Sequence, residues 1–418
     1  MVAHIITIGD EILIGQTLNT NAAFIGDQLA NIQVTVNKTS VVGDDHDDIM
    51  SEFKNCWAKN DLLIVTGGLG PTHDDITRNC IVKFFKTELI QNDDVLDDIK
   101  QIFQKRGRDV RKINEAQALV PKIAKVIKNE LGTAPGMWIE KENKIFIAMP
   151  GVPYEMHAMM QSFVIPNLTN KLKDLPNVQK RVTLETTGIP ESFLFEKLGD
   201  ISELLDGAKM AFLPSQIGVR LRITVNEKTE EEASNKLSEI EQKIRSKAGR
   251  YIFGRDGEKL EEIVGRILNE RGLKIAIAES CTGGYLSNLL TNISGSSNYF
   301  ERAVVAYSNA SKVEILKVDE DTISEYGTVS LEVAKQMAEG VKSISGTDIG
   351  LSITGIMGPT GATEGKPIGL VYIGLCDEED CTVKKFTFGE DRILNKQRTA
   401  QAALDMVRRH LLGISFDD

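Results

Sequence analysis

Short apolar runs that end in glycine or acidic residues, each followed by an amphipathic segment, recur at both ends of the 418-residue chain. Residues 3–8 and 62–66 are apolar runs of strand length, and residues 20–32 carry apolar side chains at helical spacing. The same alternation returns between residues 260 and 412. Because parallel strands need a crossover connection, usually a helix, this order predicts mostly parallel sheets covered by helices.

The remaining patterns extend this prediction over the whole chain. Further strands are expected at 33–42, 181–186, 218–225, 274–278, 303–307, 349–353 and 370–375, with a hairpin pairing 137–140 with 144–149. Further helices are expected from Asp45 to 60, from Thr72 or Asp74 to 85, and at 93–106, 154–163, 230–248, 260–271, 331–344 and 391–412. The polar stretches 166–180 and 253–259 predict linkers. The expected fold is therefore two α/β domains, 1–168 and 258–418, flanking a small α+β domain at 178–254.

Composition narrows the function classes. Acidic residues outnumber basic ones by 60 to 49, a net charge of −11, which argues against direct nucleic-acid binding. The five cysteines include no Cys-x-x-Cys pair, and their odd number argues against a disulfide framework and favours a reducing compartment. No signal peptide and no apolar run of 18 residues is present, so a cytoplasmic protein without membrane contact is expected.

Two strand ends in the first domain are rich in glycine and acid. The first strand runs into Gly9, Asp10 and Glu11, and the third into the stretch GGLGPTHDD. Glycine N–H groups at such an edge can hold phosphate, and a hard divalent cation reconciles the carboxylates with that anion. This interpretation assigns phosphate binding to Gly67, Gly68 and Gly70, and metal binding to Asp10, Asp74 and Asp75. The alternative is that Asp74 and Asp75 only favour a helix N-terminus.

Four stretches of this domain, in order, carry a resemblance: GDEILIGQTLNTNAAFI, GGLGPTHDD, GTAPG and MPGVPYEM. They resemble the molybdopterin-binding-like domain of the CinA family (competence/damage-inducible protein A). The resemblance implies an ADP-ribose pyrophosphatase that depends on a divalent metal, Mg²⁺ or Co²⁺. It also implies that further residues line the site: Asn114, Pro135, Gly136 and Glu155.

A serine at a strand-to-helix turn is the main feature of the last domain. Ser280 follows the expected strand and precedes Thr282, Gly283 and Gly284, whose amides could stabilise an oxyanion. Since no histidine lies between His157 and His410, a lysine is the expected base, and Lys312 with Tyr307 follows the next strand. The alternatives are that Ser280 is an ordinary helix cap and Lys312 a solvated surface residue.

Three further stretches, AESCTGG, FERAVVAYSNASK and GIMGPTGATEGKPIGLVYIG, resemble the C-terminal domain of the same family and the stand-alone nicotinamide mononucleotide deamidases. The resemblance implies a cofactor-free hydrolysis of nicotinamide mononucleotide to nicotinic acid mononucleotide and ammonia, a pyridine-nucleotide recycling reaction. Ser280 would be the nucleophile, Lys312 and Tyr307 its activators, and Ser297 a weaker candidate. Phosphate would bind at the loop of Gly355, Gly358 and Gly361 with help from Arg398. One departure is Ala362, which replaces a glycine usual in this loop.

The middle segment resembles a KH-type domain, yet residues 181–250 contain no Gly-x-x-Gly loop of the kind that clamps a nucleic-acid backbone. A spacing role, with dimerisation, is expected, and the whole protein is predicted to be a homodimer. Two other function classes stay open: a pterin-binding or scaffold protein, and an accessory protein in DNA uptake or repair. The carboxylate set favours catalysis over binding alone.

Overall fold

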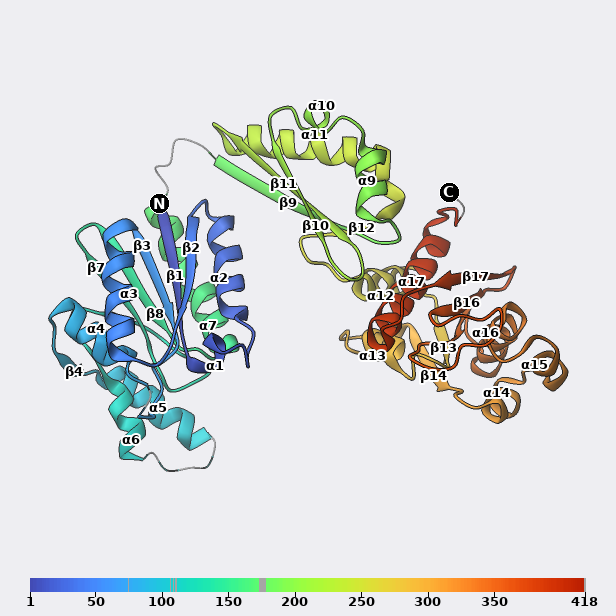
Figure 1. Cartoon of the computed structure of the whole chain (residues 1–418), viewed down its shortest axis with the longest axis horizontal. Coiled ribbons are helices and arrows are strands. Elements are labelled where there is room, and N and C mark those ends of the chain that lie inside the picture. Colours follow the sequence, from blue (N-terminus) through green and yellow to red (C-terminus); the bar gives the residue numbers. More distant parts are fainter. Residues whose placement is uncertain (74, 106, 108, 110, 173–177, 417–418) are drawn as a thin grey trace. The chain divides into compact units, whose positions relative to one another are not determined.

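The computed structural model describes residues 1–73, 75–105, 107, 109, 111–172 and 178–416 (Figure 1). The chain divides into two compact units, Met1–Gln179 and Lys180–Asp418. The second unit contains both the small α+β domain and the C-terminal α/β domain. The predicted class, α/β with a small α+β domain in the middle, is confirmed.

The first unit is built on a six-stranded sheet in the order β2-β1-β3-β8-β7-β6. Its strands are β1 Val2–Ile8, β2 Thr35–Val42, β3 Leu62–Thr66, β6 Lys125–Ile127, β7 Gly136–Lys141 and β8 Lys144–Met149, with a separate pair β4 Leu89–Gln91 and β5 Leu119–Pro121. Its helices are α1 Asp10–Leu13, α2 Thr20–Asn31, α3 His46–Lys59, α4 Thr77–Phe85, α5 Asp93–Lys105, α6 Lys112–Glu115, α7 Pro153–Met159 and α8 Ile165–Lys171. Separate apolar cores fill the two faces of the sheet.

Strands β2, β1, β3 and β8 of this sheet are parallel, and β7 and β6 are antiparallel additions at one edge. The predicted hairpin is confirmed as β7–β8. Its turn residues Glu142 and Asn143 both have positive φ, 56° and 59°, as a two-residue hairpin turn requires. The carboxyl ends of β1 and β3 lie at one sheet edge, which brings their acids and glycines together.

Three predictions for this unit are wrong in detail. Helix α4 begins at Thr77, because Thr72 donates its N–H to Asp75 and closes a separate turn before the helix. The helix expected at 154–163 stops at Met159 and passes through a π-helical turn into α8. The stretch expected as a linker from 166 is helical to Lys171, because Pro166 sits in the first turn of α8, where a proline needs no N–H partner.

The small α+β domain has a four-stranded sheet in the order β10-β11-β9-β12 packed on helices α9, α10 and α11. The elements are β9 Val178–Thr186, α9 Glu191–Leu198, α10 Ile201–Leu205, β10 Lys209–Pro214, β11 Val219–Glu227, α11 Glu230–Ala248 and β12 Ile252–Arg255. The prediction of helix 230–248 is confirmed, and Thr229 and Glu232 form its capping box. The linker predicted at 253–259 is wrong at its start, because β12 pairs with β9.

The C-terminal domain has a five-stranded sheet in the order β14-β13-β15-β16-β17. Its strands are β13 Ile275–Glu279, β14 Phe300–Val305, β15 Ile349–Gly355, β16 Leu370–Cys376 and β17 Cys381–Thr387; its helices are α12 Leu260–Arg271, α13 Tyr285–Thr291, α14 Asn309–Leu316, α15 Glu320–Tyr326, α16 Leu331–Ser345 and α17 Arg392–Leu412. Strand β13 is parallel to both neighbours, whereas β16 is antiparallel to β15 and β17. This sheet is therefore mixed, not mostly parallel.

A disulfide joins Cys376 and Cys381, which face each other in the β16–β17 hairpin. The odd cysteine count argues against a disulfide framework, but it did not indicate this single bond, which forms because the hairpin register brings two of the five side chains together. The other three, Cys56, Cys80 and Cys281, are buried free thiols.

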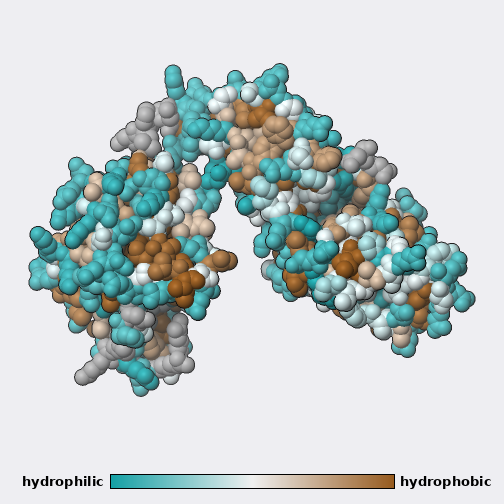
Figure 2. Space-filling model, in the orientation of Figure 1, coloured by the Kyte–Doolittle hydropathy of each residue, from teal (hydrophilic) through white to brown (hydrophobic). Residues whose placement is uncertain are grey.

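The face of the molecule in Figure 2 is largely hydrophilic, with separate hydrophobic groups. One such group lies over α1 in the first unit, where Leu13, Ile14 and Leu18 are exposed. Within the part of the chain that the structure describes, no helix is both long and apolar enough to cross a bilayer. The expected homodimer stays a prediction.

Candidate active sites

Ser280 stands at the carboxyl end of the buried strand β13, where the chain turns into α13. Its N–H donates to the carbonyl of Ile353 on β15 at 3.0 Å, so the turn is fixed to the sheet. Gly283 and Gly284 follow with φ of 63° and 93°, the left-handed conformation that glycine adopts without strain. The side chain of Ser280 is only 8% exposed.

The carboxylate of Glu279 fixes the conformation of this turn through hydrogen bonds. It is fully buried and accepts hydrogen bonds from the N–H groups of Gly284 at 2.9 Å and Ser287 at 2.8 Å. It also accepts from the N–H of Leu286 and the hydroxyl of Ser287. A buried carboxylate with four donors at a helix start is a strong acceptor, so Glu279 positions the residues around Ser280.

Lys312 reaches Ser280 from helix α14. Its Nζ donates to Ser280 Oγ at 3.0 Å, to the carbonyl of Ala306 at 2.8 Å and to that of Tyr307 at 3.4 Å. The residue is 0% exposed, so the alternative of a solvated surface lysine is wrong. Helix α14 presents Lys312 inward because Ser308 caps its start and fixes its rotation.

Burial changes the proton affinities of the two neighbours of Ser280. Desolvation lowers the pKa of Lys312 from 10.5 to about 8, so a substantial fraction of this amine is neutral at mildly alkaline pH. Desolvation raises the pKa of the Cys281 thiol to about 12, which keeps it protonated and unreactive. The pair that can perform nucleophilic chemistry here is therefore Ser280 with Lys312.

Two other predicted residues lie away from this pair. The side chain of Tyr307 is 63% exposed, and its hydroxyl lies 3.4 Å from Arg392 Nη2 rather than at Ser280. Ser297 lies in a 3₁₀ helix before β14, at the strand end that pairs with Ile275. The length of β13, roughly 16 Å for five residues, separates it from Ser280, so the assignment of Ser297 to this site is wrong.

The glycine loop 355–361 contacts the start of α17. Arg392 Nη1 donates to the carbonyl of Gly358 at 2.8 Å, and the buried Asn395 Nδ2 donates to that of Met357 at 3.0 Å. Gly358 and Gly361 have positive φ, whereas Ala362 does not, so alanine is accommodated without strain at that position. The loop therefore keeps glycine where its backbone requires it.

Arg398 was expected to assist this loop, and that expectation is corrected. Its Nε donates to the carbonyl of Gln216 in the small α+β domain at 3.1 Å. Residues 392, 395 and 396 share one face of α17, and residue 398 is rotated away from it. Lys396 lies on the active-site face: its Nζ is 3.5 Å from the position that a Cβ would take at Gly283.

The oxyanion donors also differ from the expectation. Gly284 N–H is bound to Glu279 and Gly283 N–H to the carbonyl of Ser280. In the described part of the chain, the N–H of Thr282 donates to no acceptor, and that of Cys281 contacts only its own thiol. Of the three expected oxyanion donors, the N–H of Thr282 is therefore the one available to a ligand. The neighbouring N–H of Cys281 is a further candidate.

In the first unit a cavity of about 470 Å³ opens at the carboxyl ends of β1 and β3. Five of the predicted residues line it: Gly67, Gly68, Gly70, Asp75 and Glu155. Gly67 N–H is bound to the carbonyl of Met149, so the glycine N–H groups left for a ligand are those of Gly68 and Gly70.

Several predicted residues of this unit have other surroundings. Asp10 accepts the N–H of Asp44 at 3.2 Å, and Asp44 in turn accepts the N–H of Asp10 at 3.1 Å. Gly136 begins β7 and fills a narrow space against Ile127 and Met159, so it does not line the cavity. Asn114 belongs to α6 outside the cavity lining, and Asp74 lies outside the described residues.

Sequence reasoning missed three residues of this cavity, Glu11, Asp44 and Gln117. Gln117 is 1% exposed, and its buried Oε1 has no hydrogen-bond partner in the described residues. The carboxylates offer the oxygen ligands that Mg²⁺ prefers. Among the described residues of the cavity, no three such groups bring their ligand atoms within 4.8 Å of one another. The carboxylate oxygens are of the type that a divalent cation prefers, but in this arrangement they do not converge on a single point.

Fold and sites together define a protein with an α/β domain carrying a carboxylate-lined cavity and a second α/β domain carrying a buried serine–lysine pair. Three family profiles match the chain: "Probable molybdopterin binding domain" over residues 4–170, "Damage-inducible protein CinA KH domain" over 181–254 and "CinA C-terminal domain" over 257–411.

Full-length relatives agree with these profiles. A CinA-like protein of Salinibacter ruber is 43% identical over 413 residues, 98% of this chain and 100% of the relative; that of Kosmotoga olearia is 43% identical over 414 residues, 99% of this chain and 100% of the relative. A crystal structure of CinA from Thermoplasma acidophilum covers 40% of this chain and 97% of that one, with 38% identity and a TM-score of 0.37. The chain belongs to the CinA family.

Proposed function

We propose that the C-terminal domain hydrolyses the amide of nicotinamide mononucleotide to nicotinic acid mononucleotide and ammonia. The observation that carries this proposal is the 3.0 Å contact between the buried Lys312 Nζ and Ser280 Oγ. A serine hydroxyl needs a base to attack an amide, and a lysine of lowered pKa can act as that base. The motifs around both residues resemble those of the nicotinamide mononucleotide deamidases, and this resemblance indicates the substrate.

In the first half-reaction, neutral Lys312 accepts the proton of Ser280 while Oγ bonds to the amide carbon. The negative charge that develops on the amide oxygen is stabilised by the N–H groups of Cys281 and Thr282. Lys312 then returns its proton to the amide nitrogen, the carbon–nitrogen bond breaks, and ammonia leaves. The nicotinoyl group stays bound to Ser280 as an ester.

In the second half-reaction, water attacks the ester carbon while Lys312 accepts a proton from that water. The ester bond to Oγ breaks, Lys312 returns the proton to Ser280, and the acid is released. Arg392 and Lys396 provide positive charge for the nucleotide phosphate. The backbone N–H groups of loop 355–361 provide hydrogen bonds to it. Each step uses groups of this chain, with water as co-reactant.

The test is ammonia release from nicotinamide mononucleotide by the purified full chain. Ser280→Ala and Lys312→Met should each lower kcat by roughly 10³-fold or more, because the nucleophile and its base act as a unit. Ser297→Ala is the matched serine control and Lys335→Met, on an exposed face of α16, the matched lysine control. Wild-type protein without activity, or Ser280→Ala with full activity, would refute the proposal.

For the first unit we propose a metal-dependent hydrolysis of ADP-ribose at the cavity lined by Gly68, Gly70 and Asp75. The support is the meeting of phosphate-type N–H donors with carboxylates in one cavity. A divalent cation would supply charge neutralisation at the diphosphate, held by Asp75 with Glu11 or Asp44. The glycine N–H groups and the apolar wall at Leu69 would orient the substrate.

The profile match over residues 4–170 favours a second candidate for this cavity, the binding of a pterin without turnover. The two candidates separate in one assay: AMP release from ADP-ribose with Mg²⁺, with Co²⁺ and with chelator. Hydrolysis should need the metal and fall at least tenfold in Asp75→Asn, with exposed Asp97→Asn as matched control. Binding of molybdopterin with no AMP released under any metal would favour the second candidate.

A further inference from the structure

A cluster of three potential metal ligands lies in the first unit, between the sheet and helix α3. His4 comes from β1, and Glu52 and Cys56 come from α3. An imidazole nitrogen, a carboxylate oxygen and the thiol sulfur of these residues all lie within 4.8 Å of one another. None of the three residues lines the carboxylate cavity of the same unit. The cluster is therefore separate from both candidate active sites.

Secondary structure explains why these side chains meet. Residues 3 and 5 of β1 pack on one face of the sheet, whereas residues 6 and 8 pack on the other face together with Phe53 and Cys56 of α3. Because side chains alternate along a strand, His4 faces α3. Glu52 and Cys56 are four residues apart, so they lie on the same side of that helix.

The polar atoms of the cluster are in contact with one another. Glu52 Oε1 lies 3.3 Å from Cys56 Sγ and 3.5 Å from His4 Nε2. His4 Nε2 also lies 2.9 Å from Ser40 Oγ on β2. His4 and Cys56 are 3% and 4% exposed, whereas the side chain of Glu52 is 18% exposed. The cluster is therefore buried but reaches solvent at Glu52, which gives a small ion a path of entry.

The three ligand types together fit zinc. Imidazole nitrogen, thiolate sulfur and carboxylate oxygen are the ligands that proteins use for Zn²⁺. Burial lowers the pKa of His4, which leaves its imidazole neutral at pH 7 with a lone pair for a metal. A thiolate among the ligands favours zinc over the hard cations Mg²⁺ and Ca²⁺, which take oxygen.

The charges around the cluster are compatible with a cation. The thiolate of Cys56 and the carboxylate of Glu52 together balance the two charges of Zn²⁺, so the bound site is neutral, which reduces the cost of burying it. Two positive side chains, Lys38 and Lys59, lie near enough to influence the cluster. Both lysines are exposed, so their ammonium groups can extend into solvent when a cation binds.

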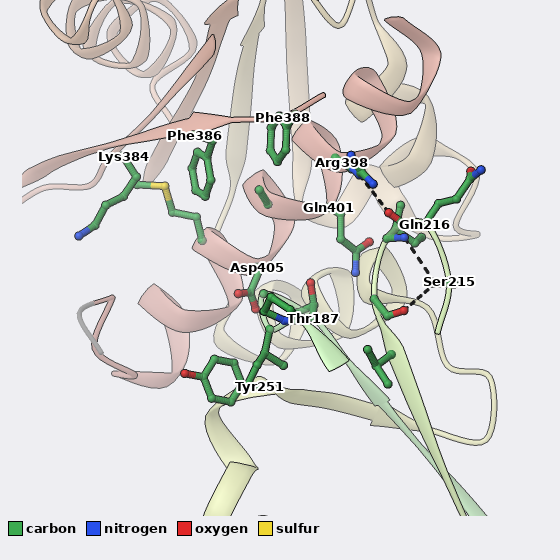
Figure 3. A pocket seen from close by; sticks show the side chains of 18 of the residues that line it. Thr187, Ser215, Gln216, Tyr251, Lys384, Phe386, Phe388, Arg398, Gln401 and Asp405 are labelled. Carbon is green, nitrogen blue, oxygen red and sulfur yellow. Dashed lines mark hydrogen bonds between the residues drawn. The ribbon is translucent and has the colours of Figure 1, made fainter. Parts of the chain in front are cut away.

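Other polar groups of the chain are matched by the protein itself. In the cavity of about 800 Å³ in the second unit (Figure 3), both oxygens of Asp405 accept hydrogen bonds from arginines. A second three-residue cluster, Glu339 with Cys376 and Cys381, has both of its sulfurs in the disulfide. Among the described residues, the cluster at His4 is the one such group that contains a free thiol.

We propose that His4, Glu52 and Cys56 bind one Zn²⁺ ion. The sulfur of Cys56 exchanges its proton for the metal, and the proton is released to solvent. Ser40 is placed to hydrogen-bond a water molecule in the fourth position of a tetrahedral site. The ion links β1 to α3 and stabilises the first unit, because it binds the folded chain and not the unfolded one.

The experiment is titration of the purified full chain with Co²⁺, which reports its ligands by absorption, with the Cys376–Cys381 disulfide intact. Binding at the cluster should produce the near-ultraviolet charge-transfer band of a thiolate–cobalt bond, and one equivalent of Zn²⁺ should abolish it. Cys56→Ala should lose the band. Cys56→Ala and His4→Gln should each weaken Zn²⁺ binding, measured by competition with a chelator, roughly tenfold or more.

Two control variants accompany this titration. Cys80→Ala removes another buried free cysteine, on α4 outside the cluster, and should keep both the band and the zinc affinity. Asp75→Asn should also keep the band, which separates this site from the cation proposed at the carboxylate cavity. A band that persists in Cys56→Ala, or that is lost equally in Cys80→Ala, would overturn the proposal.

A second measurement does not depend on variants. X-ray absorption at the zinc edge of the loaded wild-type protein should show one sulfur ligand at about 2.3 Å, with nitrogen or oxygen ligands at about 2.0–2.1 Å. The Tm should be higher with Zn²⁺ than with chelator. A zinc shell without sulfur, or no Zn²⁺ retained by the wild type, would contradict the assignment. Zinc bound equally by the wild type, Cys56→Ala and His4→Gln would indicate an adventitious ion only and would equally overturn it.

Discussion

Lys312 Nζ and Ser280 Oγ lie 3.0 Å apart although 32 residues separate them in the chain. Strands β13 and β14 are parallel neighbours, so the residues that follow them emerge at the same sheet edge. Ser280 follows β13 directly, and Lys312 is on the first helix after β14. The topology of two adjacent parallel strands therefore builds the pair.

The first prediction concerns the pH dependence of deamidation. Only neutral Lys312 can accept the serine proton, and burial lowers its pKa to about 8. The value of kcat/KM should rise about tenfold per pH unit below pH 8 and level off above it. Initial rates between pH 6 and 10 at constant ionic strength check this. Tyr307→Phe should keep the inflection, and a flat profile from pH 6 to 9 would contradict the role of Lys312.

The second prediction concerns stability. The folded-state pKa of Lys312, about 8, lies below its ordinary value of 10.5, so between these values the unfolded chain binds more protons. Stability contributed by this group therefore rises with pH from 8 to 10.5 and is lost as pH falls. Lys312→Met removes the titration, so its stability relative to wild type should be greatest at pH 7 and decline toward pH 10.

Urea unfolding of both proteins at each pH measures that difference, in which the other titrating groups largely cancel. Lys335→Met, which removes an exposed ammonium, should show no such decline. A stability difference between Lys312→Met and wild type that is constant from pH 7 to 10 would mean that Lys312 is not desolvated in the folded protein.

Much of the fold follows from the sequence because local signals are strong where an element is long and periodic. Helix 230–248 and strand 62–66 were predicted with their observed bounds, and the start of α16 at residue 331 was as well. Errors fall where tertiary contacts override the local pattern. Residues 252–255 form a strand only because β9 supplies the partner, and the Cys376–Cys381 pair exists only in the hairpin register.

The site residues show the same difference: some could be placed from local motifs, and others depend on tertiary structure. Motif position was enough to place Ser280, Lys312 and the glycines after Thr66 at sheet edges. It was not enough for residues whose role depends on helix rotation. Arg398 was expected at the phosphate loop, whereas the arginine that contacts this loop is Arg392, in the first turn of α17. Ser297 was misplaced because it precedes β14, and residues before a strand lie at the sheet edge opposite to those that follow its parallel neighbour.

The third prediction concerns Glu279 as a positioning residue. Glu279→Gln keeps the shape but sets an amide NH₂ against N–H and hydroxyl donors in a fully buried place. Loss of such charge-assisted bonds should cost about 2 kcal/mol of unfolding free energy and lower kcat, with KM less affected. Urea unfolding and kinetics measure both. Glu301→Gln, an exposed carboxylate paired with Lys274, is the matched control, and equal effects of the two variants would contradict the positioning role.

The fourth prediction distinguishes phosphate recognition from catalysis. Arg392 stands at the start of α17, with Nη1 on the carbonyl of Gly358 in the glycine loop. In the proposed reaction Arg392 binds the substrate phosphate, so in Arg392→Ala the KM for nicotinamide mononucleotide should rise roughly tenfold or more with a smaller change in kcat. Nicotinamide riboside, which lacks the phosphate, should react equally well with wild type and variant.

Steady-state kinetics of both substrates with wild type, Arg392→Ala and Arg266→Ala complete this test. Arg266 is an exposed arginine on α12 paired with Glu258, and its removal should leave both KM values as they are. If Arg392→Ala impairs the nucleoside as much as the nucleotide, the arginine supports the loop through Gly358 and does not bind phosphate. Lys396 would then be the remaining cation on the active-site face of α17, because Arg398 points to the small α+β domain.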